Sequence, residues 1–311
     1  QFVVNSGAYG GDKVYFQCGA TGPLTFYYKC QIHSTSMVGE IKVIGANPEY
    51  PHTATTTESQ TTTTTTTTTE TATPFSGVEF TLNTFDGEAQ LPFYTHQIKS
   101  NSAVTVDWGD GSSPETINYA AQDADPTQNY ITHTYSTPTV TATNFTIKIT
   151  GDYEILHGQN VNTNFKNNCT SVRLGLSPSL ESLEFNNFSQ LKSADFSEAT
   201  DLPALESIYF LFAYCSSLKS FNAGNFDTSN VTDMRSAFQN TGLTSLDLSG
   251  LDTSSATTMF QMFRGSNQLQ SLDVSNFDTS KVTNPQYMFT YCSSLISLDL
   301  SSFNFNKIQW N

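Results

Sequence analysis

The sequence predicts a mainly β protein in four parts: a short β segment (1–50), a Thr-rich linker (51–75), a β-sandwich (76–153) and a solenoid of stacked coils (154–311). Three observations support this prediction. Apolar and polar residues alternate in many short runs, as in half-buried strands. A stretch between residues 53 and 73 consists mostly of Thr. In the C-terminal half, one phrase returns every 25 or 26 residues, which indicates a solenoid.

The N-terminal segment contains strand-like runs but too few of them for an independent domain. Residues 14–16 and 24–28 are rich in aromatic and β-branched side chains, and residues 39–44 alternate polar with apolar. Fifty residues of strand give only a thin core. We therefore expect a partial β-fold here.

The linker is defined by its composition, with an unbroken Thr run from Thr61 to Thr69. Such a segment cannot bury enough apolar surface to offset the loss of chain entropy, so it should not fold. Dense Thr followed by Pro74 suits O-glycosylation, which would stiffen the linker into a stalk. An unmodified flexible spacer is the alternative.

The third part reads as an antiparallel β-sandwich. Residues 78–82, 103–108 and 144–151 alternate apolar with polar, and turn residues such as Gly109-Asp-Gly-Ser-Ser-Pro114 separate the runs. Short strands with frequent turns are the pattern of a sandwich.

The fourth part repeats the phrase Leu-x-Ser-Leu-Asp-aliphatic, beginning at Leu243, Leu269 and Leu295. Successive strand residues point to opposite faces, so the aliphatic side chains should point inward and the Asp between them outward. Between these strands lies a second phrase with Asp-Thr-Ser, followed by Met and Phe. We expect it to form short helical turns that the Asp-Thr-Ser caps.

The cysteines are expected to pack rather than react. Cys215 and Cys292 each precede a strand-starting Leu by three residues, and Asn240 and Ser266 occupy this slot in other coils. A small residue in a repeated interior slot is a packing residue. Five cysteines in 311 residues are also too few for a disulfide scaffold.

The repeated phrases resemble the BspA-type leucine-rich repeat over about residues 169–311. That family occurs on bacterial cell surfaces and in large-genome viruses, usually for adhesion or surface display. The resemblance implies that the chain is exposed on a surface and assigns no chemistry to it.

The run Val104-Thr-Val-Asp-Trp-Gly-Asp-Gly, with the later His133-Thr-Tyr, is similar to PKD-type domains over about residues 78–152. The resemblance implies a turn at Asp107 and Asp110 and a strand at His133, rather than a catalytic or metal site.

The run Tyr28-Lys-Cys-Gln-Ile-His-Ser-Thr-Ser-Met37 resembles the ligand loop of cupredoxin-like domains. Blue copper takes a thiolate, two imidazoles and a weak thioether, and Cys30, His33 and Met37 match three of these ligands. Residues 1–29 contain no His. Copper would therefore need a ligand from a neighbouring chain, and the alternative is a truncated β-fold that keeps the loop for packing.

Composition excludes several classes of function. With 13 Lys+Arg, 28 Asp+Glu and a net charge of −15, the chain should repel nucleic acid. No apolar run is long enough for a membrane span. The sequence has no recognisable nucleophile–base pair and no phosphate-binding Gly loop, so we expect no enzyme. Surface carboxylates could gather Ca²⁺, although no EF-hand loop makes this specific.

Four Asn-x-Ser/Thr triplets are glycosylation candidates if the chain passes through a eukaryotic-type secretory route, and chance is the alternative in so polar a chain. They begin at Asn144, Asn168, Asn187 and Asn230.

Together these features favour a non-catalytic extracellular, cell-surface or virion-surface protein that forms or decorates a fibre, sheath or appendage. Its partners would be copies of itself or other surface proteins. The first alternative is an adhesin that recognises a host glycan or protein through the outward column of Asp247, Asp273 and Asp299. The second is a copper electron-transfer module. Since the chain begins at Gln1 without a basic and apolar leader, we expect a processed product, a fragment, or a subunit completed by its neighbours.

Overall fold

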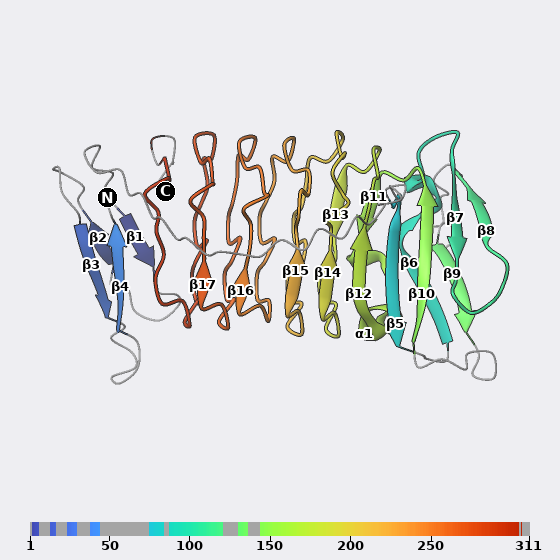
Figure 1. Ribbon diagram of the computed structural model, residues 1–311, viewed down its shortest axis with the longest axis horizontal. Helices are drawn as coiled ribbons and strands as arrows, with labels where there is room; N and C mark the ends of the chain where they lie inside the picture. The colour runs from blue at the N-terminus through green and yellow to red at the C-terminus, as the bar shows by residue number, and fades with distance from the viewer. Residues whose placement is uncertain are drawn as a thin grey trace, which may run out of the picture.

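The chain is mainly β with very little helix, as the sequence predicts. The longest described helix is α1 (Thr163–Asn168), and no described helix is long and apolar enough to cross a bilayer. The others are the 3₁₀ helices η1 (Thr95–Gln97) and η3 (Gly158–Asn160). The computed structural model (Figure 1) describes residues 2–5, 13–16, 24–29, 38–43, 75–83, 87–120, 130–135, 144–304 and 306.

The N-terminal segment forms two antiparallel strand pairs. β1 (Phe2–Asn5) pairs with β2 (Lys13–Phe16), and β3 (Leu24–Lys29) pairs with β4 (Val38–Val43). The three predicted strand-like runs fall on β2, β3 and β4. Most of the predicted linker lies outside the described residues.

The sandwich consists of a larger and a smaller antiparallel sheet. The larger has the order β8–β7–β10–β5, and the smaller pairs β6 with β9. Alternate residues of both sheets are buried in one core, including Phe80 and Phe93. The strands are β5 (Val78–Asn83), β6 (Gly87–Tyr94), β7 (Ala103–Asp107), β8 (Glu115–Asn118), β9 (Tyr130–Tyr135) and β10 (Asn144–Gly151).

The larger sheet continues from the sandwich into the coils without a break. β12 (Cys169–Leu174) pairs antiparallel with β5 on one side and parallel with β14 (Ser193–Asp195) on the other, and β15 (Ser220–Asn222) follows. A separate parallel pair joins β16 (Ser245–Leu246) to β17 (Ser271–Leu272). Figure 1 shows these strands side by side along the molecule. We call this row of strands the first ladder.

A second ladder runs along another side of the coils. β11 (Ile155–His157) pairs parallel with β13 (Ser182–Glu184). Single parallel bridges then lead from Ser182 through Ser207, Asp233 and Thr258 to Asn284, with partners 25 or 26 residues apart. Each turn of the chain, here called a coil, therefore contributes to both ladders.

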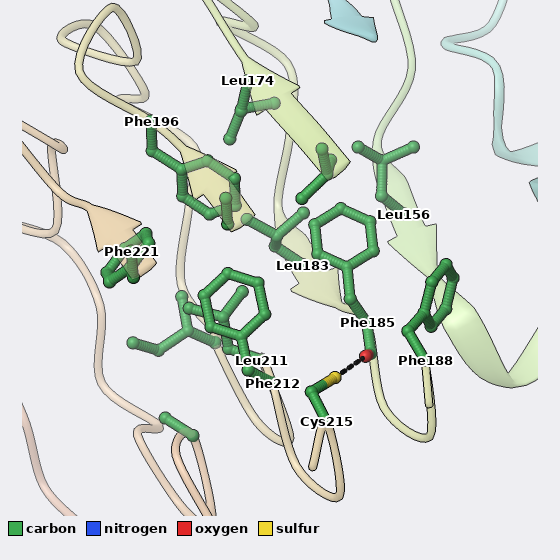
Figure 2. Packing of buried hydrophobic residues seen from close by; sticks show 14 of the residues in the cluster. Leu156, Leu174, Leu183, Phe185, Phe188, Phe196, Leu211, Phe212, Cys215 and Phe221 are labelled. Carbon is green, nitrogen blue, oxygen red and sulfur yellow. Dashed lines mark hydrogen bonds between the residues drawn. The ribbon is translucent and has the colours of Figure 1, made fainter. Parts of the chain in front are cut away.

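The core between the ladders is one stack of aromatic and aliphatic side chains (Figure 2). The rings of Phe238 and Phe263 stack with centroids 5.7 Å apart, and those of Phe263 and Phe289 with centroids 5.6 Å apart. At the other end, Phe80 of β5 lies 5.8 Å from Phe185, ring centroid to ring centroid. The core of the sandwich thus passes directly into the core of the coils.

The helical turns predicted for the Asp-Thr-Ser phrases are wrong for the described coils, because no helix occurs within residues 169–304. Each phrase forms a single turn, in which Val231 N–H donates to Thr228 O at 3.0 Å. The Asp does bond to the backbone as a cap would, because Asp227 Oδ1 accepts from Ser229 N–H at 3.1 Å, but what it closes is a turn and not a helix. No helix propagates because the following backbone groups bond to the neighbouring coil.

Candidate functional site

The predicted column of aspartates points outward, but its carboxylates hold turns. Asp247, Asp273 and Asp299 are exposed, and each Oδ1 accepts the backbone N–H of the serine two residues later, at 3.0, 2.9 and 2.8 Å respectively. Hydrogen bonds from the backbone and hydroxyl of Ser249 lower the pKa of Asp247, and those from the hydroxyl and backbone of Ser275 lower the pKa of Asp273. A structural role therefore accounts for these aspartates.

The other predicted ligand and modification sites are scattered. Cys30, His33 and Met37, the predicted copper ligands, lie outside the described residues. Of the glycosylation candidates, Asn144, Asn187 and Asn230 are exposed and Asn168 is half-buried. The structure does not bring them together. The Nδ2 groups of Asn168 and Asn230 donate to the backbone oxygens of Asn164 and Pro203, at 2.8 and 3.1 Å.

The Asp107–His133 region of the sandwich is a braced turn. Asp110 Oδ2 lies 2.9 Å from His133 Nε2, and the His133 ring stacks on Trp108 with centroids 4.7 Å apart. Burial raises the pKa of Asp110, but hydrogen bonds from Ser112 and His133 outweigh it and lower this pKa to about 2. These contacts fix the turn to β9.

The described cysteines are packing residues. Cys215 Sγ donates to Phe185 O at 3.0 Å (Figure 2). Burial raises the pKa of Cys215 to about 12 and that of Cys292 to about 11, which leaves the thiols protonated. One slot assignment is wrong, because Thr241 occupies the interior slot and Asn240 does not. That coil has one residue fewer between the slot and its strand, which moves Asn240 to the surface.

An aromatic surface lies along the second ladder, at positions two and three residues after the bridging residues. We call it the aromatic face. Arg235 Cζ lies 4.7 Å from the ring centroid of Tyr209, and Arg235 Nη2 is paired with Asp233 Oδ2 at 2.6 Å. The aromatic face comprises Tyr209, Phe210, Arg235, Phe260 and Tyr287.

Backbone hydrogen bonds between neighbouring coils fix the spacing between the residues of the aromatic face. Phe210 N–H donates to Arg235 O at 3.0 Å. Along the chain, the rings of Tyr209 and Phe210 have centroids 4.0 Å apart. Between coils, the centroids of Phe260 and Tyr287 are 5.8 Å apart. Aromatic side chains from several coils therefore lie along one ladder in two contacting groups, with Arg235 and Tyr287 exposed and the others half-buried.

A polar hollow borders this face, four residues further along each coil. Its column contains Tyr214, Asn240, Gly265 and Tyr291, all with left-handed backbone, φ 63°, 53°, 74° and 63°. Tyr214 and Tyr291 are 44% and 53% exposed and lie in this column on either side of Asn240 and Gly265, beside the hollow rather than in its lining. The hollow has a volume of about 440 Å³ and is lined by Ser216, Lys219, Asn240, Thr241, Gly242, Gly265, Asn267 and Gln268.

Sequence reasoning missed both surfaces. The repeat reveals positions that are the same in every coil, and those lie in the core or hold turns, as Asp247 and Asp273 do. Outward positions such as Arg235, Phe260 and Tyr287 differ from coil to coil, so they form no repeated pattern. An available signal was that two of the three arginines in the chain, Arg235 and Arg264, fall in this region.

Comparison with known proteins bears on these same coils. Residues 206–310, about a third of the chain, match a family model described as "Mycoplasma protein of unknown function, DUF285". No curated protein and no solved structure matches the chain. The match agrees with the resemblance of these repeats to BspA-type surface proteins. The coils that carry the aromatic face and the hollow are thus similar to a family of Mycoplasma proteins.

Proposed function

We propose that the chain is a non-catalytic protein of a cell or virion surface, in which a stiff stack of coils presents a binding face. The aromatic face is the observation that carries this proposal. Tyr and Arg are enriched among the residues that dominate the binding energy of protein interfaces. Tyr buries a large area with little conformational cost, and Arg supplies charge and several hydrogen-bond donors. A stack held by two ladders and one core keeps such side chains in fixed positions.

The polar contacts of the coils favour binding over catalysis. His157 Nε2 lies 2.8 Å from Ser182 Oγ, which superficially suits a nucleophile–base pair. His157 Nδ1, however, faces the amide of Gln159 at 3.5 Å, where a catalytic triad would need a carboxylate. The buried thiols are protonated and cannot serve as nucleophiles.

To test the proposal, the full chain is attached to beads, and the fraction of beads retained on a panel of bacterial and eukaryotic cell surfaces is measured. The triple variant Tyr209→Ser, Phe260→Ser, Tyr287→Ser should lose at least tenfold in retention on any surface that the wild type binds. Tyr119→Ser, at an exposed tyrosine of the sandwich, serves as the matched control and should not change retention. Equal retention of wild type and triple variant would refute the proposal.

We assign the coils to the BspA-type leucine-rich repeat and the sandwich to the PKD type as part of this proposal. Parallel pairing between residues 25 or 26 apart supports the first assignment. The braced turn at Trp108 and its contact with His133 support the second. Both resemblances belong to proteins displayed outside the cell.

A second candidate function, end-to-end assembly into a fibre, is favoured by the last described coil. Ile296 is 76% exposed, and Leu298, Leu300 and Phe303 are only partly buried. One exposed apolar side chain beside partly buried ones makes an apolar surface that favours association. Electron microscopy at high protein concentration should reveal filaments that Ile296→Asp abolishes, whereas dispersed monomers of the wild type would exclude assembly through this end.

Copper binding at Cys30, His33 and Met37 stays a prediction from the sequence. Titration of the full chain with Cu(II) tests it, since a thiolate–copper site absorbs visible light intensely. A colourless titration would remove this alternative.

A further inference from the structure

We infer that the hollow between Tyr214 and Tyr291 binds an anionic oligosaccharide. The inference builds on the proposed role of the coils as a binding surface, but it concerns different residues from the aromatic face. Three features carry it: the exposed tyrosines on either side of the hollow, the polar residues that line it, and two cations, Lys219 in the lining and Arg264 beside Tyr291.

The two tyrosines set the length of the ligand. Tyr214 and Tyr291 occupy equivalent positions in coils three steps apart, which corresponds to roughly 14 Å at the usual spacing of neighbouring strands. Between them the column contains Asn240 and Gly265, whose side chains are smaller than tyrosine. The surface between the two tyrosines is therefore lower than the rings on either side of it. A short oligosaccharide fits this span, and an exposed ring at each end can stack on the apolar face of a sugar.

The floor offers hydrogen bonds of both kinds. Asn240, Asn267 and Gln268 present amide groups, which donate through nitrogen and accept through oxygen, and Ser216 adds a hydroxyl. Gln268 Nε2 already donates to Asn267 Oδ1 at 3.1 Å, which orients both amides. Sugar hydroxyls, which themselves donate and accept, are complementary to such a floor.

The charge at the hollow is opposite to that of the chain. Lys219 lines it, and Arg264 lies against Tyr291, with Cζ 5.4 Å from the ring centroid. Within the described residues neither cation forms an ion pair, whereas Arg173 and Arg235 are each paired with carboxylates. No acidic residue lines the hollow, although the whole chain carries −15. Lys219 Nζ donates to Gly242 O at 3.1 Å, which holds the ammonium at the hollow without neutralising its charge. The charges of Lys219 and Arg264 therefore select a carboxylate or sulfate group on the ligand.

The backbone of the column gives the hollow its shape. A Cβ on Gly265 would meet the end of the Asn240 side chain at Oδ1, and the left-handed backbone at this position favours glycine. Tyr214 and Tyr291 adopt left-handed backbone too, which is strained for a non-glycine residue. Because the side chains of both tyrosines remain substantially exposed, core packing does not explain this choice of residue.

Isothermal titration calorimetry of the full chain tests the inference with three tetrasaccharides: a galacturonate for carboxylate, a sulfated carrageenan for sulfate, and a neutral cellotetraose. At least one anionic sugar should bind tenfold more tightly than the neutral one, with affinity that falls as salt rises. The better sugar identifies the anionic group. No binding of either anionic sugar, or equal binding of the neutral one, would overturn the inference.

Variants locate the site. Tyr214→Ala and Tyr291→Ala should each weaken binding at least tenfold, and Lys219→Gln with Arg264→Gln should abolish the preference for the anionic sugar. Tyr119→Ala, at an exposed tyrosine of the sandwich that belongs to neither proposed site, is the matched control and should bind like the wild type. Wild-type affinity in the hollow variants would contradict the inference, as would equally tight binding of a glutamate-rich peptide of the same charge.

The two proposals can fail separately. If the aromatic-face triple variant loses retention on cells while no anionic sugar binds, the binding surface stands and the oligosaccharide site is wrong. If the sugar binds in the hollow but the triple variant is retained on cells like the wild type, the oligosaccharide site is supported and the aromatic face is not the attachment surface.

Discussion

Glu184 has a carboxyl group buried on the second ladder, and its Oε1 has no hydrogen-bond partner among the residues that the structure describes. Burial raises its pKa to about 7, even though the nearby Lys166 of α1 acts to lower it. The folded state therefore keeps a proton that the unfolded chain would release near pH 4.5. Such a group supports folding fully below pH 4.5, and this support is lost as pH rises through about 7.

Replacing this carboxyl by an amide should make stability less dependent on pH. We expect Glu184→Gln to raise the free energy of unfolding by about 3 kcal/mol at pH 8 and to leave it nearly unchanged at pH 4. The half-buried His157 on the adjacent strand, whose pKa is lowered by burial, titrates in both proteins, so its effect largely cancels when the two are compared. Urea unfolding at the two pH values measures the effect. Equal gains at both would show that packing, not ionisation, is responsible.

Gly265 offers a second test at the scale of one residue. Gly265→Ala should destabilise the fold by about 1 to 3 kcal/mol, because the new Cβ meets Asn240 Oδ1 and the backbone φ is +74°. Adding Asn240→Gly should recover part of the loss by removing the obstructing amide. Denaturant unfolding of the single and double variants measures this. A single variant as stable as the wild type would contradict the geometry of the column.

The burial of a single residue could be predicted from the sequence where the same residue type recurs at the same position of each coil. The interior positions of Cys215, Leu246 and Leu272 follow from their spacing alone. The burial of Glu184 does not, because it depends on contacts across coils and with α1. The position of Asn240 also could not be predicted, since its coil is one residue shorter after the slot.

At the scale of elements, buried threonines of the Asp-Thr-Ser turns join neighbouring coils. Thr253 Oγ1 accepts from Asp278 N–H at 2.8 Å and donates to Asp278 O at 3.2 Å. Thr228 makes the same pair of bonds with Asp252, at 2.9 and 2.8 Å. One hydroxyl thus satisfies two backbone groups of the next coil, which explains why the phrase recurs.

Removing one hydroxyl of this series should cost far more than removing an exposed one. Thr253→Val keeps the shape of this buried side chain but removes both hydrogen bonds to the N–H and C=O of Asp278, and we expect a loss of about 2 to 3 kcal/mol. Thr257→Val is the control, since the exposed Thr257 Oγ1 only donates to Thr232 O at 3.1 Å, and its loss should stay below about 1 kcal/mol. Thermal or urea unfolding compares the two. Similar losses would show that the hydroxyl series contributes no special stability.

The strands of the coils could be predicted from their period, but their turns could not. Met and Phe at spacings of three and four match a helix as well as a coil corner, so the pattern alone favoured the wrong element. The pairing of β5 with β12 could not be predicted either, because Phe80 and Val172 are far apart in sequence and belong to no common repeat. The aromatic face combines positions that the repeat leaves variable.

At the scale of the whole molecule, the sandwich closes one end of the coil stack. β12, the first strand of the first ladder, is covered by β5 and has no free edge. An ion-pair chain strengthens this junction, since Arg173 contacts Glu79 at 3.4 Å and Glu198 at 2.7 Å. Solenoids need such terminal caps, and here an entire domain serves as the cap.

The central claim is that the sandwich and the coils form one stiff body that holds its binding surfaces in place. The most direct test is a distance distribution from pulsed electron spin resonance, with spin labels on non-natural residues at Thr116 in β8 and Ser271 in β17. Eight strand-to-strand steps predict one narrow peak at roughly 40 Å. A broad or multiple distribution would mean that the two parts move independently, and would contradict the claim.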